Sequence, residues 1–173
     1  AAGMPGSVVL CAVAVAGMLA AEYRDSRGGL WLTKPLASAA FVWLGLVSGA
    51  LDSGYGRLVL LALALCLLGD LLLIPRDRPK VFRAGVFAFL LAHVAFSVAF
   101  LTRPLDPYGL AAGAVIVGVV ILTVLRWLGK SLPADMVFAV RTYMLVIGVM
   151  SVLACGVSAA GGPWAVAVGA LAF

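Results

Sequence analysis

Charged residues are scarce in this chain. Only 11% of its 173 residues are Asp, Glu, Lys or Arg, whereas 65% are hydrophobic, and the mean hydropathy is +1.19. This composition excludes a soluble globular domain and predicts a polytopic membrane protein. The apolar runs have the length of membrane helices, which need about 20 residues, and not of the shorter alternating strands of a barrel. We therefore expect an all-α transmembrane helical bundle that forms a single domain over residues 1–173.

Metal-binding and nucleophilic motifs are scarce as well. One histidine, His93, and three separated cysteines, Cys11, Cys66 and Cys155, do not match a catalytic zinc site, which normally has three protein ligands with two or more histidines. The sequence has no GxSxG motif, no Ser-His-Asp order and no P-loop. We therefore expect no metal and no cofactor, and we interpret the cysteines as small packing residues.

Hydrophobic segments fill most of the chain. The first segment lacks a basic residue before it, so a membrane span is favoured over the alternative of a cleaved signal peptide. Gly161-Gly162-Pro163 breaks the last apolar stretch and predicts a partial seventh span from Trp164 onward. Gly45 and Gly49 form a GxxxG pair that is typical of helix contacts. The six complete predicted spans are Met4–Ala21, Trp31–Ala50, Arg57–Ile74, Ala84–Leu101, Tyr108–Leu125 and Asp135–Val157.

The basic residues predict how the chain lies in the membrane. A net charge of +5 does not indicate nucleic-acid binding here, because the basic residues lie in short loops between spans. Eight of them follow the first, third and fifth spans, and two lie in the alternate loops. The positive-inside rule then predicts an inner-membrane protein with cytoplasmic basic loops and its N-terminus outside. The eight are Arg24, Arg27, Arg76, Arg78, Lys80, Arg83, Arg126 and Lys130, and the two are Arg57 and Arg103.

Four ionisable residues lie inside predicted spans. A carboxylate near the middle of a membrane helix costs roughly 2.5 to 3.5 kcal/mol, so Asp70 suggests a function. At a rise of ~1.5 Å per residue, Lys34, Asp70 and Arg141 lie roughly 5 to 9 Å from the predicted cytoplasmic boundary. His93 lies deeper, at roughly 14 Å. This layer predicts a pocket that opens to the cytoplasm, with His93 at its floor.

Each of these residues also has a structural explanation. Lys34 and Arg141 could snorkel to headgroups, Asp70 could pair with either cation, and His93 could be an interhelical hydrogen-bonding group. Tyr143 points about 200° away from Arg141 on a helix, so the two cannot both face one pocket squarely. Because Lys34, Asp70 and Arg141 lie in the same leaflet, the pattern favours general acid/base chemistry by the Asp70 carboxylate, with the two cations binding an anionic headgroup.

Several short motifs follow one another along the chain. They are Lys34-Pro35-Leu36, Leu68-Gly69-Asp70, Phe82, Gly85, Phe89, Ala92-His93, Tyr143, Met150 and Gly169-Ala170-Leu171-Ala172-Phe173. Together these motifs resemble the signature of the YhhN-like lysoplasmalogenases. The resemblance implies an eight-helix membrane enzyme that hydrolyses the vinyl ether bond of lysoplasmalogens to a fatty aldehyde and a glycerophospho-base.

The resemblance also assigns roles to residues. Asp70 becomes the leading catalytic acid and His93 the second catalytic residue. We expect Lys34, Phe89, Arg141 and Tyr143 to bind the substrate. The family pattern continues past Phe173 with a Ser-Asp or Ser-Asn pair and an eighth span, so we expect a chain truncated on its C-terminal side. The expected partner is a lysophospholipid in the membrane, and the alternative function is a protein that binds or transports lysolipids without cleaving them.

Overall fold

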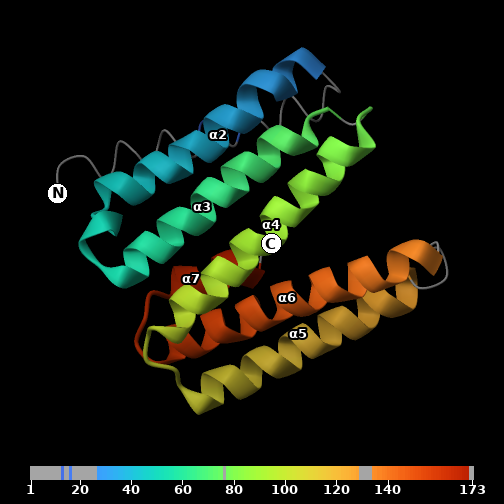
Figure 1. Ribbon diagram of the computed structural model, residues 1–173. Coiled ribbons are helices and arrows are strands. Elements are labelled where there is room, and N and C mark those ends of the chain that lie inside the picture. Colours follow the sequence, from blue (N-terminus) through green and yellow to red (C-terminus); the bar gives the residue numbers. More distant parts are fainter. Residues whose placement is uncertain (1–12, 14–15, 17–26, 76, 129–133, 172–173) are drawn as a thin grey trace. The chain divides into compact units, whose positions relative to one another are not determined.

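The computed structural model describes residues 13, 16, 27–75, 77–128 and 134–171 (Figure 1). The described residues form helices and no strand, which confirms the prediction of an all-α helical bundle. In chain order the elements are α2 (Arg27–Val47), the 3₁₀-helix η1 (Ala50–Asp52), α3 (Gly54–Leu73), α4 (Pro79–Leu101), α5 (Pro107–Leu128), α6 (Ala134–Ala159) and α7 (Trp164–Leu171).

Four of the described helices are long and apolar enough to cross a membrane, so the prediction of seven spans is too high. Helix α2 has 21 residues and contributes the shorter apolar segment Thr33–Val47, which is not among the four. Helix α7 has only 8 residues. The predicted span Met4–Ala21 lies outside the described residues, except for residues 13 and 16. The four helices are Gly54–Leu73, Pro79–Leu101, Pro107–Leu128 and Val137–Ala159.

The chain divides into two compact units, residues 1–95 and residues 96–173. The boundary falls inside α4, so the first unit contains α2, η1, α3 and most of α4. The second unit contains the end of α4 together with α5, α6 and α7. The single domain expected over residues 1–173 stays a prediction.

In the first unit, a tight turn joins α2 to α3. Gly49 has a φ of 78°, a left-handed conformation that glycine adopts without steric cost, and it ends α2. The Ser53 side chain then accepts a hydrogen bond of 3.0 Å from the backbone N–H of Gly56 and caps α3. The predicted GxxxG contact is therefore half wrong. Gly45 packs against Leu60 and Leu63 of α3, but Gly49 belongs to the turn.

Small residues bring the helices of the first unit close together. A Cβ added to Gly69 of α3 would lie 2.6 Å from the ring of Phe89 on α4. A Cβ added to Gly85 of α4 would lie 3.0 Å from Leu73. These two contacts fix the antiparallel register of α3 and α4. Gly69 is level with Phe89, and Leu73, four residues later on α3, is level with Gly85, four residues earlier on α4. The buried apolar residues of this unit are alanines, namely Ala37, Ala40, Ala62, Ala88, Ala92 and Ala95.

In the second unit, α5 and α6 form an antiparallel hairpin, and α7 packs against α6. The predicted start of the last segment at Trp164 is confirmed. Gly161 has a φ of 94° and ends the preceding helix, and the Ser158 hydroxyl accepts a 3.2 Å hydrogen bond from the backbone N–H of Ala167. The buried Ser151 hydroxyl donates a hydrogen bond of 3.1 Å to the carbonyl oxygen of Ala170, which ties α7 to α6.

Candidate active site

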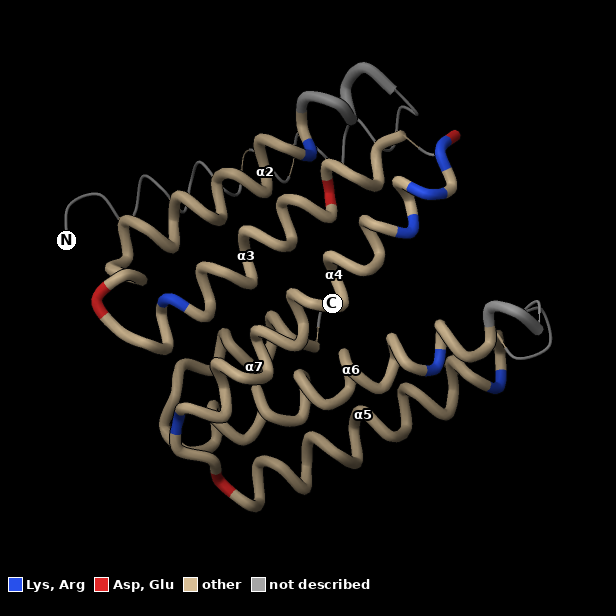
Figure 2. The backbone as a smooth tube through the Cα atoms, viewed as in Figure 1, with Lys and Arg blue, Asp and Glu red and all other residues tan. Residues whose placement is uncertain are grey.

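Asp70 is a carboxylate inside an apolar helix. It lies one turn before the end of α3 and is half-buried, and long stretches of α3 to α6 carry no charged residue (Figure 2). The Ser38 hydroxyl of α2 donates a hydrogen bond to its Oδ2 atom. A hydrogen bond to a charged acceptor contributes about 1.5 to 3 kcal/mol, a range that overlaps the cost of placing Asp70 in the helix. The carboxylate is therefore held by a defined partner on a neighbouring helix.

Lys34 lies one turn before Ser38 on α2. Residues four apart lie on the same face of a helix, so the face that carries Ser38 to Asp70 also carries Lys34. Lys34 is half-buried. In the described part of the chain, the hydrogen bond to Asp70 comes from Ser38 and not from Lys34. Lys34 and Ser38 therefore share one face of α2, and Ser38 is the residue that donates to the carboxylate.

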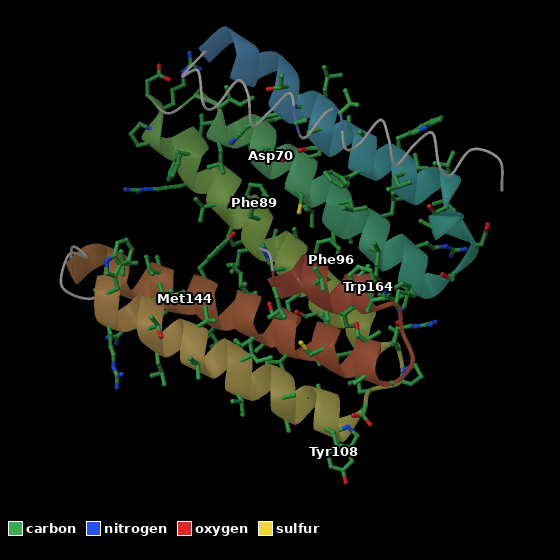
Figure 3. The ribbon with its side chains drawn as sticks, turned by 180° about the vertical axis from the view of Figure 1, so that it is seen from behind. Asp70, Phe89, Phe96, Tyr108, Met144 and Trp164 are labelled. Atoms are coloured by element: carbon green, nitrogen blue, oxygen red, sulfur yellow. The ribbon has the colours of Figure 1, made fainter. Side chains whose placement is uncertain are left out.

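Phe89 of α4 packs against the backbone of α3 at Gly69. Its ring lies over the buried Gly69, the residue that precedes Asp70, and a side chain at position 69 would occupy the space of the ring. Figure 3 shows Asp70 on α3 and Phe89 on α4. The absence of a side chain at Gly69 thus lets an aromatic ring approach the α3 backbone next to Asp70. This ring gives the Asp70 region an apolar wall.

His93 lies one turn beyond Phe89 on α4 and is fully buried, with 0% of its surface exposed. Its Nδ1 atom lies 2.5 Å from the carbonyl oxygen of Phe89. A carbonyl oxygen only accepts, so Nδ1 carries the hydrogen, and in the neutral ring Nε2 carries the lone pair. The helix backbone thus assigns the tautomer in which Nε2 is the basic nitrogen.

The register of α3 and α4 gives the depth of His93 relative to Asp70. Phe89 lies level with Gly69, so His93 lies level with Leu65 and Cys66. At 1.5 Å per residue, this is roughly 7 Å deeper along the helix axis than Asp70. A hydrogen-bonded carboxylate and a neutral imidazole therefore stand at two levels on adjacent helices, an arrangement suited to general acid and general base catalysis.

Arg141 and Tyr143 belong to the second unit, on α6. Arg141 is exposed and Tyr143 is half-buried. Their contact with a substrate stays a prediction. In the described part of the chain, no three residues among His, Cys, Asp and Glu gather where they could hold a metal ion.

Sequence reasoning missed Ser38. The spacing of four residues between Lys34 and Ser38 was the available signal, because it places both side chains on one helix face. It also missed the role of Gly69, which makes room for the Phe89 ring.

Comparison with known proteins gives one result. The model of the YhhN family matches residues 29–173, which include every residue of the cluster around Asp70. Searches of the curated proteins and of the solved structures give no match.

Proposed function

From the premise that the chain belongs to the YhhN family of membrane proteins, we propose that it is a lysoplasmalogenase. It would hydrolyse the vinyl ether bond of a lysoplasmalogen and release a fatty aldehyde and a glycerophospho-base. The observation that carries the proposal is the Asp70 carboxylate, held by Ser38 inside an apolar helix with Lys34 one turn away. A buried carboxyl group with one fixed hydrogen bond is suited to store and deliver a proton.

Asp70 acts first in this mechanism, as a carboxylic acid. Ser38 binds Oδ2, so Oδ1 carries the proton that is transferred to the vinyl carbon distant from the ether oxygen. The transfer turns the vinyl ether into an oxocarbenium ion and leaves Asp70 as a carboxylate. This negative charge stabilises the cation, and the Ser38 donor stabilises the carboxylate that forms.

Water completes the reaction. It adds to the oxocarbenium carbon, and the Nε2 lone pair of His93 takes its proton. The protonated His93 then gives its proton to the glycerol oxygen of the hemiacetal, and this oxygen leaves as an alcohol. The Asp70 carboxylate takes the proton of the hemiacetal hydroxyl, the carbon that carried both oxygens becomes the aldehyde carbon, and both residues return to their starting states. The difference of roughly 7 Å in depth between Asp70 and His93 gives room for the bond and one water molecule.

Binding uses the charge and the apolar wall around Asp70. Lys34 attracts the phosphate of the lysolipid, and Phe89 contacts the alkenyl chain. A zwitterionic or anionic headgroup is compatible with this arrangement, because both carry the phosphate. The proposed partner is therefore a single-chain phospholipid that enters from the membrane.

The test uses the purified full chain in detergent with lysoplasmenylethanolamine, and the released aldehyde is measured by mass spectrometry. Replacement Asp70→Asn is expected to lower turnover at least 100-fold, because general acid catalysis contributes about 10² to 10⁴ in rate. The control is Asp77→Asn, which alters an exposed carboxylate in the turn after α3. Unchanged turnover in the Asp70 variant would remove this residue from the mechanism.

Two further readouts separate vinyl ether hydrolysis from other lipid reactions. In D₂O, the aldehyde should carry one deuterium on the carbon next to the carbonyl, because that carbon receives the proton. A lysolipid with a saturated ether should not be cleaved, because it has no double bond to protonate. Retention of lysolipid without any product would support the alternative of a binding or transport protein.

We also propose that the protein lies in the inner cell membrane with its basic loops in the cytoplasm. The excess of Lys and Arg in the loops after the first, third and fifth predicted spans supports this orientation. Single cysteines at Lys80 and Arg103 test it in intact cells. A thiol reagent that does not cross the membrane should label the cysteine at position 103 and not the one at position 80, and the reverse pattern would reject the orientation.

A further inference from the structure

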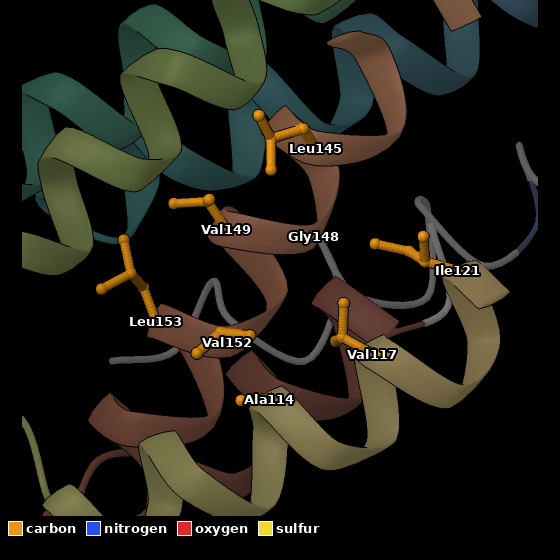
Figure 4. Close-up of a pocket in the computed structure, with 9 residues that line it drawn as sticks. Ala114, Val117, Ile121, Leu145, Gly148, Val149, Val152 and Leu153 are labelled. Carbon is orange, nitrogen blue, oxygen red and sulfur yellow. The ribbon is translucent and has the colours of Figure 1, made fainter. Parts of the chain in front are cut away.

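An apolar groove runs between α5 and α6 in the second unit. Its volume is about 320 Å³, at the lower end of the range of small-ligand sites. Figure 4 shows its side chains coming from α5 on one side and from α6 on the other. None of the lining residues is polar. They are Ala114, Val117, Gly118, Ile121, Leu145, Gly148, Val149, Val152 and Leu153.

The two helices pack most closely beside one end of the groove. A Cβ added to Gly113 would lie 2.8 Å from Cys155, and one added to Gly109 would overlap Ala159. Further along α5, Gly118 lines the groove and has nothing within 4 Å of an added Cβ. The groove therefore begins next to the contact at Gly113 and extends toward the loop between α5 and α6.

Arg141 stands at the mouth of this groove. It precedes Leu145 by one turn, and at 100° per residue it lies within about 40° of Leu145, Gly148 and Val152 around the helix axis. Arg141 is exposed. A single cation thus follows directly on the apolar stripe that lines the α6 side of the groove.

Arg126 of α5 lies at the same level but on another face. Gly113 is level with Cys155, and a Cβ added to Gly148 would lie 3.0 Å from Ile121, so the antiparallel register puts Arg126 beside Arg141 in depth. Around the α5 axis, Arg126 is turned about 140° away from Ile121. The two arginines therefore carry the same charge, are both exposed and lie at the same depth. They differ in that Arg141 lies in line with the groove and Arg126 does not.

Exposed aromatic side chains mark the same end as the membrane interface. Trp127 is 77% exposed and Phe138 is 80% exposed, and each flanks the loop between α5 and α6. Aromatic residues gather where the hydrocarbon meets the headgroups. The groove thus ends roughly 10 Å inside this interface, at Ile121 and Leu145, and Arg141 lies between the two levels.

We propose that the groove binds one acyl chain of an anionic bilayer phospholipid, whose phosphate the Arg141 guanidinium holds. The apolar lining fits a hydrocarbon chain, and the cation at its mouth complements a negative headgroup. A second copy of the chain in a two-fold contact would bring like charges at Arg141 together, which disfavours that occupant. The proposal uses residues of the second unit alone and does not depend on the proposed enzymatic function.

Native mass spectrometry of the purified full chain in detergent micelles tests this site. Dioleoyl phosphatidylglycerol and dioleoyl phosphatidylcholine are added at equal concentration, and the bound fraction of each is measured. One basic residue near a membrane surface supports a preference of about fivefold for the anionic lipid. Arg141→Gln should bring the ratio close to one, whereas the matched control Arg126→Gln should keep the wild-type ratio.

Filling the groove tests the position of the acyl chain. Gly118→Leu has open space for its side chain and should lower the retention of both lipids, as should Val149→Phe on the opposite helix. Equal retention of the two lipids by the wild type would overturn the proposal. An equal fall in the ratio of bound anionic to zwitterionic lipid in the two arginine variants would also overturn it. Full retention of both lipids in both groove-filling variants would do the same. A disulfide-linked dimer formed efficiently through Val149→Cys would assign the groove to a second copy instead.

Discussion

The two units both pack helices through small residues, yet they produce different surfaces. In the first unit, Gly45 packs against Leu60 and Leu63 where α2 meets α3, and across the same helix interface the Ser38 hydroxyl donates a hydrogen bond to Asp70. In the second unit, Gly109 and Gly113 close one part of the α5–α6 hairpin and leave an apolar groove beside it. Close packing of membrane helices can therefore hold a polar group or leave a lipid-sized space, depending on the side chains that follow the contact.

The first prediction concerns His93 and has the largest expected effect. Asn at this position keeps a side-chain N–H that can reach the Phe89 carbonyl but lacks the Nε2 lone pair. His93→Asn should lower aldehyde release about 100-fold, because it removes the proposed base. Thermal unfolding in detergent should move by only a few degrees, as about 1 kcal/mol does in a protein of this size. Wild-type turnover in a folded variant would leave His93 a purely structural role.

The second prediction compares hydroxyl groups in the two units. Ser38 donates across helices to Asp70, whereas Thr142 of α6 donates a hydrogen bond of 2.9 Å to Phe138 in its own helix. Ser38→Ala should reduce turnover roughly tenfold or more, since a hydrogen bond to a charged group is worth about 1.5 to 3 kcal/mol. Thr142→Val should leave turnover unchanged. An equal fall in turnover in both variants would contradict a specific role for the hydroxyl that donates to Asp70.

A third prediction compares glycines. Alanine at Gly69 would contact the Phe89 ring at 2.6 Å, whereas alanine at Gly118 meets nothing within 4 Å. Gly69→Ala should lower the free energy of unfolding by about 1 to 3 kcal/mol, as overpacked cores do. Gly118→Ala should raise it by up to about 1 kcal/mol, because alanine favours helix over glycine. Unfolding in sodium dodecyl sulfate measures both, and a change of the same sign in the two would contradict the packing of these helices.

The fourth prediction concerns helix caps, for which we expect the smallest effects on stability, of similar size in the two units. Ser53 caps α3, and Asp106 caps α5 by accepting a hydrogen bond of 2.8 Å from the backbone N–H of Gly109. Replacement of either by Ala should lower the free energy of unfolding by about 1 kcal/mol, because a cap is a local interaction. The same unfolding measurement applies. A loss several times larger at one cap would indicate that this turn also supports its unit through longer-range contacts.

Several elements of the fold could be predicted from local chemistry. The Gly161-Gly162-Pro163 break located the start of α7 at Trp164, because glycine and proline act on their immediate neighbours. The number of spans was overestimated, since apolar composition does not show where a helix ends. Gly49 illustrates this limit. Its left-handed φ of 78° closes α2 before the end of the predicted span.

The candidate site was predictable in its residue types but not in its contacts. An Asp, a Lys and a His in apolar segments stand out because hydrocarbon penalises them. The partner of Asp70 was not predictable, because Lys34 and Ser38 share one face of α2 and the choice between them depends on how far α2 is shifted along its axis relative to α3. The groove between α5 and α6 was missed for a similar reason. The groove depends on the distance between α5 and α6 beyond the contact at Gly113, and the sequence of one helix alone does not determine that distance.

The hydrogen bond between Ser38 and Asp70 also bears on how the chain enters the membrane during synthesis. Inserted alone, α3 would carry its carboxylate into the bilayer at a cost of roughly 2.5 to 3.5 kcal/mol. Inserted together with α2, it brings its own donor, and the short turn through Gly49 keeps the two helices adjacent. We therefore expect the translocation machinery to release α2 and α3 into the bilayer together as one hairpin, because Ser38 then supplies a hydrogen bond to Asp70.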